Sequence, residues 1–246
     1  MTAIRGARAR ARSDITAAIK DEARRQLAAE GAAKLSLRAV ARELGMASSA
    51  LYRYFPSRDD LLTALILDAY NAIGEAAEAA DPTAPGRPAD AERDTAVDDV
   101  DALIGRWTAV CAAVRSWALA HPHEYALIYG SPVPGYHAPR ATAEPAGRVA
   151  LALIAVVRDA YASGTLQEPA GPLSDAVAGE ARALAAELDI ELPAPVTAVL
   201  VATWAQLFGL ISFELFGQFH RVIEDRDAFF AHTVRRLAAG VGLAPP

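Results

Sequence analysis

Small hydroxyl side chains, tyrosines and an arginine occur together within residues 48–54, whose sequence is SSALYRY. Hydroxyl groups on small residues can approach base edges closely, and tyrosine hydroxyls and arginines can bind phosphate oxygens. The chemistry that this combination favours is therefore binding to DNA. The competing interpretation is an ordinary helical hairpin in which the tyrosines are half buried for packing.

Two short amphipathic helices are predicted to position these side chains. The first has apolar residues at the spacing i, i+3, i+4, i+7, which forms one buried stripe of an α-helix. These residues are Leu37, Val40, Ala41 and Leu44. Ser36 can cap its first turn, and Gly45 can adopt the left-handed conformation that ends it. In the second helix Leu51 and Phe55 face inward, which leaves the serines and tyrosines on its sides and outer face.

This segment resembles the DNA-binding domain of the TetR family of transcriptional regulators, whose fingerprint is A-x-x-L-G, five residues, L-Y-x-[HY]-F, a basic residue and a leucine. The matching residues are Ala41, Leu44, Gly45, Leu51, Tyr52, Tyr54, Phe55, Arg58 and Leu61 or Leu62. The resemblance implies that Tyr52 and Arg58 bind phosphates. It implies base contacts by Ser48, Ser49, Ala50 and Tyr54, with Arg38 reaching in from the preceding helix. Ala47 stands where the family usually has a capping serine or threonine, so that cap is missing or Ser48 supplies it.

The charge of the chain is divided along its length. Residues 1–60 carry 12 Lys and Arg against 7 Asp and Glu, a net charge of +5, and the remainder has a net charge of −11. A basic part beside an acidic part concentrates the attraction for phosphates in one domain. Four arginines, Arg5, Arg8, Arg10 and Arg12, precede a helix expected to begin near Ser13. Residues 1–12 are interpreted as a basic flexible arm, which either adds affinity for DNA or is a solvated tail.

The expected fold is all-α, with a three-helix helix-turn-helix domain in residues 1–60 and a helical effector-binding and dimerisation bundle in residues 61–246. A connecting helix at 57–80 joins them, and the proline-rich residues 81–94 form a loop. Further helices are predicted at about 96–120, 125–129, 142–163, 173–188, 194–218 and 226–240. No segment reaches about 18 apolar residues without a charge, so no membrane span is expected. The single Cys111 and the lack of a signal sequence indicate a cytoplasmic protein.

The C-terminal part resembles the WHG type of TetR C-terminal domain. The resemblance rests on the segment HPHEYALIYGSPVPGYHAP and on WAQLFGLISFELFG some 65 residues later. Phe208 stands where the type usually has a histidine, which makes the local chemistry more apolar. Any ligand contact that relatives make through that histidine is not expected in this chain.

Aromatic and thiol side chains of this part could line an apolar cavity for a small-molecule effector, or could simply be core residues. They are Trp107, Cys111, Trp117, Tyr125, Tyr129, Trp204 and Phe208. Glu214 lies within an apolar helix and must be paired with an arginine such as Arg115 or lie near water, because an isolated buried carboxylate is very costly. No metal site and no cofactor are expected.

The function predicted from these features is that of a ligand-responsive transcriptional regulator, more specifically a repressor. One helix-turn-helix contacts only a few base pairs, so the active species is expected to be a homodimer on a palindromic operator of double-stranded DNA. The apolar helices 194–218 and 226–240 are the candidates for its interface. The alternatives are an all-α enzyme, for which no catalytic constellation is recognisable, and a structural DNA-binding protein without sequence preference.

Overall fold

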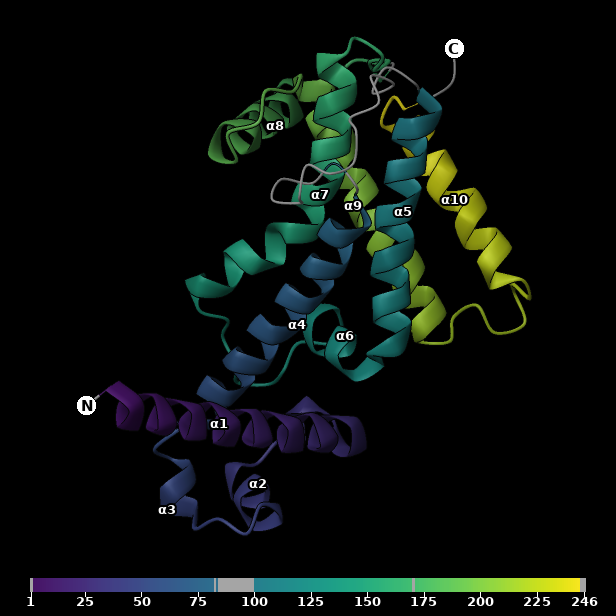
Figure 1. The fold of residues 1–246 in the computed structure, drawn as a ribbon. Coiled ribbons are helices and arrows are strands. Elements are labelled where there is room, and N and C mark those ends of the chain that lie inside the picture. Colours follow the sequence, from purple (N-terminus) through teal and green to yellow (C-terminus); the bar gives the residue numbers. More distant parts are fainter. Residues whose placement is uncertain (1, 82, 84–99, 170, 244–246) are drawn as a thin grey trace. The chain divides into compact units, whose positions relative to one another are not determined.

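The computed structural model describes residues 2–81, 83, 100–169 and 171–243, and the all-α prediction is confirmed. No strand occurs among these residues. Figure 1 shows the helices, with short 3-10 turns at Ala32–Lys34 and Arg140–Thr142. The helices are α1 (Thr2–Glu30), α2 (Leu37–Glu43), α3 (Ser48–Leu51), α4 (Arg58–Ala80), α5 (Val100–Ala120), α6 (Pro122–Tyr129), α7 (Ala143–Ala162), α8 (Asp175–Glu187), α9 (Ala194–Leu215) and α10 (Arg226–Gly240).

The main difference from the predicted helices lies at the N-terminus. Helix α1 begins at Thr2 instead of near Ser13, so the structure does not contain the flexible arm expected before it. The reason is composition, since this stretch consists largely of alanine and arginine, which are strong helix formers, and has no proline. The predicted loop at 81–94 and the first turn of the predicted helix 96–120 lie outside the described residues, except for Asp81 and Thr83.

The chain divides into two compact units. Unit 1 comprises Met1–Asn71 and His121–Pro145, and unit 2 comprises Ala72–Ala120 and Ala146–Pro246. Unit 1 is therefore larger than the predicted DNA-binding domain of residues 1–60, because it includes the first part of α4 and a second segment that contains α6. The chain passes between the units three times, and α4 contributes to both.

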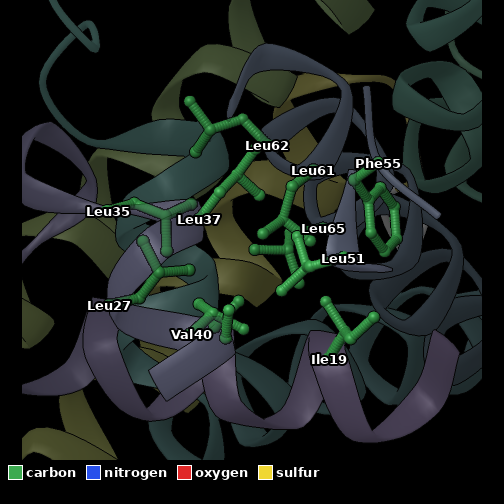
Figure 2. Packing of buried hydrophobic residues seen from close by; sticks show 12 residues of the cluster. Ile19, Leu27, Leu35, Leu37, Val40, Leu51, Phe55, Leu61, Leu62 and Leu65 are labelled. Atoms are coloured by element: carbon green, nitrogen blue, oxygen red, sulfur yellow. The ribbon is translucent and has the colours of Figure 1, made fainter. Parts of the chain in front are cut away.

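The core of unit 1 joins the first four helices. Ile19 and Leu27 of α1 pack with Val40 of α2, Leu51 of α3 and Leu61 of α4, as Figure 2 shows. The inward-facing positions predicted for Leu37 to Leu44 and for Leu51 and Phe55 are thus confirmed. The segment after α5 is attached to this core by polar contacts as well. The Arg24 side chain bonds Glu124 of α6 at 3.2 Å, and the hydroxyls of Thr63 and Tyr136 lie 2.9 Å apart.

Unit 2 is built around α5, which packs against α9 and α10, while α8 packs against α9. The indole of Trp107 is fully buried, and its Nε1 donates a hydrogen bond to the carbonyl oxygen of Val234 at 3.1 Å. The predicted partner of Glu214 is confirmed. Arg115 forms two bonds with the Glu214 carboxylate at 2.7 and 2.6 Å, and a third with the exposed Asp227 at 2.7 Å.

Helix α9 is long and apolar enough to span a membrane by length and composition alone, so the expectation that no segment has this property is wrong. The reason is that threonine, glutamine and serine interrupt its apolar residues but no charged residue lies between Glu191 and Glu214. A buried helix of a globular domain has the same composition. The burial of Val196, Leu207 and Ile211 places α9 in the core of unit 2.

A buried ion cluster holds the end of α4 in unit 2. The Arg106 guanidinium of α5 bonds the Asp81 carboxylate at 3.0 and 2.9 Å and that of Asp159 at 2.8 Å. Burial by itself raises the pKa of Asp81, but hydrogen bonds from Arg106 and Thr83 outweigh it, so this pKa lies below its ordinary value. Two carboxylates therefore compensate one buried cation.

We predict that Asp81→Asn lowers the free energy of unfolding by about 3 kcal/mol, because it leaves Arg106 buried with incomplete compensation. The measurement is urea unfolding at fixed protein concentration. Since the folded-state pKa of Asp81 is lowered, its contribution is complete above the unfolded-state pKa of about 4 and is lost as the pH falls through the folded-state pKa. The difference between wild type and variant should therefore shrink on acidification.

The matched control is Asp227→Asn. The Asp227 carboxylate lies 2.7 Å from Arg115, and the Asp227 side chain is 88% exposed. Exposed ion pairs contribute about 0 to 1 kcal/mol, so this variant should unfold nearly as the wild type does. Equal effects of the two substitutions would show that burial does not determine the importance of the Asp81 pair.

Candidate nucleic-acid interface and effector cavity

Helix α2 has the caps that the sequence predicts, but the prediction that the second helix includes Phe55 is wrong, because α3 ends at Leu51 and residues 52–54 form a turn. The Ser36 hydroxyl accepts a hydrogen bond from the backbone N–H of Ala39 at 3.4 Å, and Gly45 has a φ of 64°. Ala47 is the N-cap residue of α3 and makes no side-chain cap. Ser57 caps α4, because its hydroxyl accepts from the N–H of Asp60 and donates to the carboxylate of Asp60.

Most of the residues predicted to contact DNA are accessible on unit 1. Arg38, Ser48 and Ser49 are exposed, and Tyr52 is 43% exposed. Ala50 is half-buried at the base of the same surface. The arrangement leaves small polar groups at the start of α3 and a tyrosine hydroxyl after its end, which suits contact with base edges and a neighbouring phosphate.

Arg58 has a different environment from that implied by the resemblance. Its guanidinium donates to the carbonyl oxygens of Leu35 at 3.1 Å, Ala32 at 2.8 Å and Ala33 at 3.3 Å, and only 29% of the side chain is exposed. These carbonyls belong to the segment between α1 and α2. Arg58 therefore fixes this segment against α4, and most of its donors are already engaged.

Tyr54 has a neighbour that the sequence analysis did not identify. The guanidinium of Arg12 lies over the ring of Tyr54, 5.2 Å from its centroid. The half-buried ring also packs against the core of unit 1. The signal available in the sequence was the row of arginines before Ser13. Their relation to α3 could not be found because the helix that carries them was expected to be an arm.

The residues predicted to line an effector cavity belong to both units of the chain. Trp107, Cys111 and Trp117 are buried on α5 in unit 2. Burial raises the pKa of the Cys111 thiol to about 12, so this thiol stays protonated at neutral pH. Trp204 and Phe208 are neighbours on α9 with ring centroids 5.7 Å apart, and only Trp204 is exposed.

Tyr125 and Tyr129 belong to unit 1 and are part of a cluster of tyrosines. The Tyr129 ring lies 5.2 Å from that of Tyr125 and 5.9 Å from that of Tyr70, measured between centroids. Burial raises the pKa of the Tyr129 hydroxyl far above its ordinary value. This cluster attaches α6 to α4 within unit 1.

An apolar cavity of about 340 Å³ lies between α7, α8 and α9 in unit 2. Among the predicted ligand residues, only Trp204 lines it. The hydroxyl of Thr197 donates to the carbonyl oxygen of Pro193 at 3.2 Å, so the wall offers little to a polar ligand. The lining residues are Ala146, Gly147, Ala150, Leu153, Ile154, Leu184, Leu188, Ile190, Leu192, Thr197, Leu200, Val201 and Trp204.

Helix α7 connects this cavity with α4. One face of α7 carries Gly147 and Ala150 into the cavity, and the adjacent Arg148 binds Glu78 of α4 through two bonds of 2.8 and 2.7 Å. The contact is close, because a Cβ placed on Gly74 would lie 2.7 Å from the Cβ of Arg148. A movement of α7 in unit 2 would therefore act directly on the end of α4.

The described residues contain no group of three or more His, Cys, Asp or Glu side chains that could hold a metal ion.

Two family descriptions match the chain. Residues 19–65 match bacterial regulatory proteins of the tetR family, and residues 107–237 match the tetracyclin repressor-like C-terminal domain. The first range contains α2 and α3, and the second contains the apolar cavity. The WHG type is not named by the second description and stays a prediction.

The chain is also similar to curated regulators over nearly its whole length. It is 38% identical over 236 residues to an HTH-type transcriptional regulator of Mycobacterium tuberculosis (strain H37Rv), and equally to one of Mycobacterium bovis. The matched residues cover 95% of this chain and 95% of each relative.

Solved structures share the fold. The crystal structure of the regulatory protein SCO4313 matches with a TM-score of 0.69 and 34% identity, and covers 94% of this chain and 98% of its own. A tetR-family regulatory protein from Rhodococcus RHA1 has a TM-score of 0.59 at 18% identity, covering 94% of this chain and 98% of its own.

Proteins of this family are transcriptional regulators, not enzymes. The fingerprint across α2 and α3, the two family matches and the full-length relatives agree. The chain therefore belongs to the TetR family and is a DNA-binding transcriptional regulator.

Proposed function

We propose that this protein is a cytoplasmic, homodimeric repressor that binds a palindromic operator and is released by a small, largely apolar molecule. The observation that carries this proposal is the exposed polar surface of α3, which the core of unit 1 holds outward. The divided charge supports it, since the excess of cations lies in residues 1–60. Attraction to phosphates is therefore concentrated where α3 meets DNA.

The proposed DNA contacts follow the exposure of the side chains, except at the half-buried Tyr54. Ser48, Ser49 and Tyr54 are assigned to base edges with Ala50 close to them, and Arg38 and Tyr52 to the adjacent bases and backbone. Arg58 is retained in the interface through its residual exposure of 29%. Its main role is to hold the turn before α2, because three carbonyl oxygens already accept from its guanidinium.

The proposed dimer interface lies on α9 and α8. Val201 and Phe213 of α9 are 46% and 53% exposed, and Val177 of α8 is 43% exposed, which is unusual for large apolar side chains. Helix α10 is a poorer candidate than the sequence indicates. It directs its apolar residues toward α5 and leaves Arg235 and Arg236 exposed.

The proposed effector site is the apolar cavity between α7, α8 and α9. Its volume lies at the small end of the range for ligand pockets, which favours a compact molecule. Trp204 is the predicted ligand residue that remains in this site. Phe208 supports the Trp204 ring from the core, and Trp107, Cys111 and Trp117 are assigned to the core of unit 2. Tyr125 and Tyr129 are assigned to the packing of α6 in unit 1.

The proposed response begins at α7. A ligand that binds one arrangement of the cavity more tightly shifts the protein toward that arrangement. Arg148 then transmits a displacement of α7 to Glu78 near the end of α4. Because α4 continues into unit 1, the separation of the two α3 helices in a dimer would change. The effector and the operator would thus influence each other's affinity reciprocally.

Tyr52→Phe tests the DNA contacts. It removes only a hydroxyl, and losing a hydrogen bond to a charged phosphate should weaken operator binding at least about tenfold. Fluorescence anisotropy with a duplex from the chain's own promoter region measures this. Tyr161→Phe is the matched control, because Tyr161 is 44% exposed but lies on α7 in unit 2. Equal affinity of wild type for specific and scrambled duplexes would contradict the proposed function.

Ala150→Phe tests the effector cavity. The added ring should fill the space between α7, α8 and α9, so the variant should bind operator but lose its response to effectors. In a thermal-shift screen of small apolar compounds, a ligand at 100 times its dissociation constant should stabilise wild type by about 2.7 kcal/mol and leave the variant unaffected. Ala162→Phe, at an exposed position of the same helix, is the control. Full retention of the shift in Ala150→Phe would exclude this cavity.

Arg148→Met tests the coupling between the cavity and α4. Methionine keeps an unbranched side chain beside Gly74 but removes the ion pairs with Glu78. Ligand binding and DNA binding should each persist, while the effect of ligand on DNA affinity, typically 5- to 150-fold in coupled systems, should fall severalfold. Arg158→Met is the control, since the Arg158 side chain is 57% exposed and its ion pair is with the adjacent Asp159. Unchanged coupling in Arg148→Met would exclude this route.

A further inference from the structure

The described side chains at the start of α1 are exposed. Residues 6, 7 and 9–14 are helical yet exposed, and Ile19 is the first fully buried residue among the side chains of this helix that the structure describes. Helices shorter than about 12–15 residues are marginal in water without packing. Burial within unit 1 therefore does not explain the amino-acid composition of this part of α1.

The charges at the start of α1 are all positive. Residues 1–13 contain four arginines and no acidic residue, and the first turn of α1 is likewise without an acid. Cations at the positive end of the helix dipole repel it, so this composition is unfavourable for the isolated helix. An external polyanion would remove the conflict.

Arg12 places this cationic segment beside the DNA-binding surface. Its guanidinium lies over the ring of Tyr54, and Figure 1 shows α3 below the N-terminal half of α1. A stacked guanidinium keeps N–H donors at its edge that can bind a phosphate. The next cations along α1 differ, because Lys20 and Arg24 are both bonded to Asp68, at 2.8 and 2.7 Å. Among the described residues, Arg10 and Arg12 have no such carboxylate partner.

We propose that the N-terminal turns of α1 form a second DNA-contact surface, in which Arg10 and Arg12 bind backbone phosphates flanking the bases that α3 contacts. This inference rests on the proposed DNA-binding function. The contact is to the backbone and not to the minor groove, because a helix about 10–12 Å wide does not fit a groove about 6 Å wide. A flexible arm could enter the minor groove, whereas the helical segment contacts the backbone.

The experiment compares wild type with the double variant Arg10→Gln, Arg12→Gln. Glutamine has a helix propensity close to that of arginine, so α1 should keep its structure. The dissociation constant is measured against salt concentration, on an operator duplex with flanking base pairs and on one trimmed to the two half-sites. We expect the slope of log K against log salt to fall by about 0.9 for each phosphate that the variant no longer binds. Trimming should weaken the wild type and leave the double variant unaffected.

The control is Arg235→Gln, Arg236→Gln, which makes the same charge change at exposed positions of α10 and should leave the slope unchanged. An unaltered slope and an equal response of wild type and variant to trimming would overturn the proposal. A changed oligomeric mass with an unaltered slope would mean that the arginines bind another copy of the chain, which also overturns it. Failure of the wild type to distinguish operator from scrambled duplex instead refutes the proposed regulatory function, a result separate from the slope comparison.

Discussion

The structure of unit 1 depends on the burial of Leu51 and Phe55. Helix α3 has four residues, too few to be stable by its own hydrogen bonds, so tertiary packing must hold it. Leu51 is fully buried and Phe55 is 6% exposed, in a core that also includes α1, α2 and α4. That packing directs Ser48 and Ser49 outward. Arg58 stabilises this arrangement further by binding carbonyl oxygens between α1 and α2. This residue of the fingerprint thus supports the DNA-binding surface indirectly.

The second constraint is the way the chain alternates between its units. Three passages connect them, and the end of α4 is fixed in unit 2 by Arg106 through Asp81 and by Arg148 through Glu78. Buried and half-buried ion pairs of this kind are sensitive to the position of both partners, since displacement leaves a charge uncompensated. The ion pairs that stabilise unit 2 are therefore expected to respond to a change in the cavity beside α7.

The cations of α1 differ in whether they have a carboxylate partner. Asp68 binds Lys20 and Arg24 in the middle of α1, whereas Arg10 and Arg12 have no carboxylate partner among the described residues. The stacking of Arg12 on Tyr54 brings the start of α1 next to α3.

The sequence by itself determined the all-α fold, the inward-facing residues at 37–44 and at Leu51 and Phe55, the caps at Ser36 and Gly45 and the pairing of Glu214 with Arg115. These follow from local periodicity and from the cost of burying a single charge. Only the tertiary structure decided which aromatic residues meet, because contacts such as that of Trp107 with Val234 join residues far apart in the chain. It also brought Arg12 onto Tyr54. Local spacing contains no information about such contacts, since they depend on how whole helices pack.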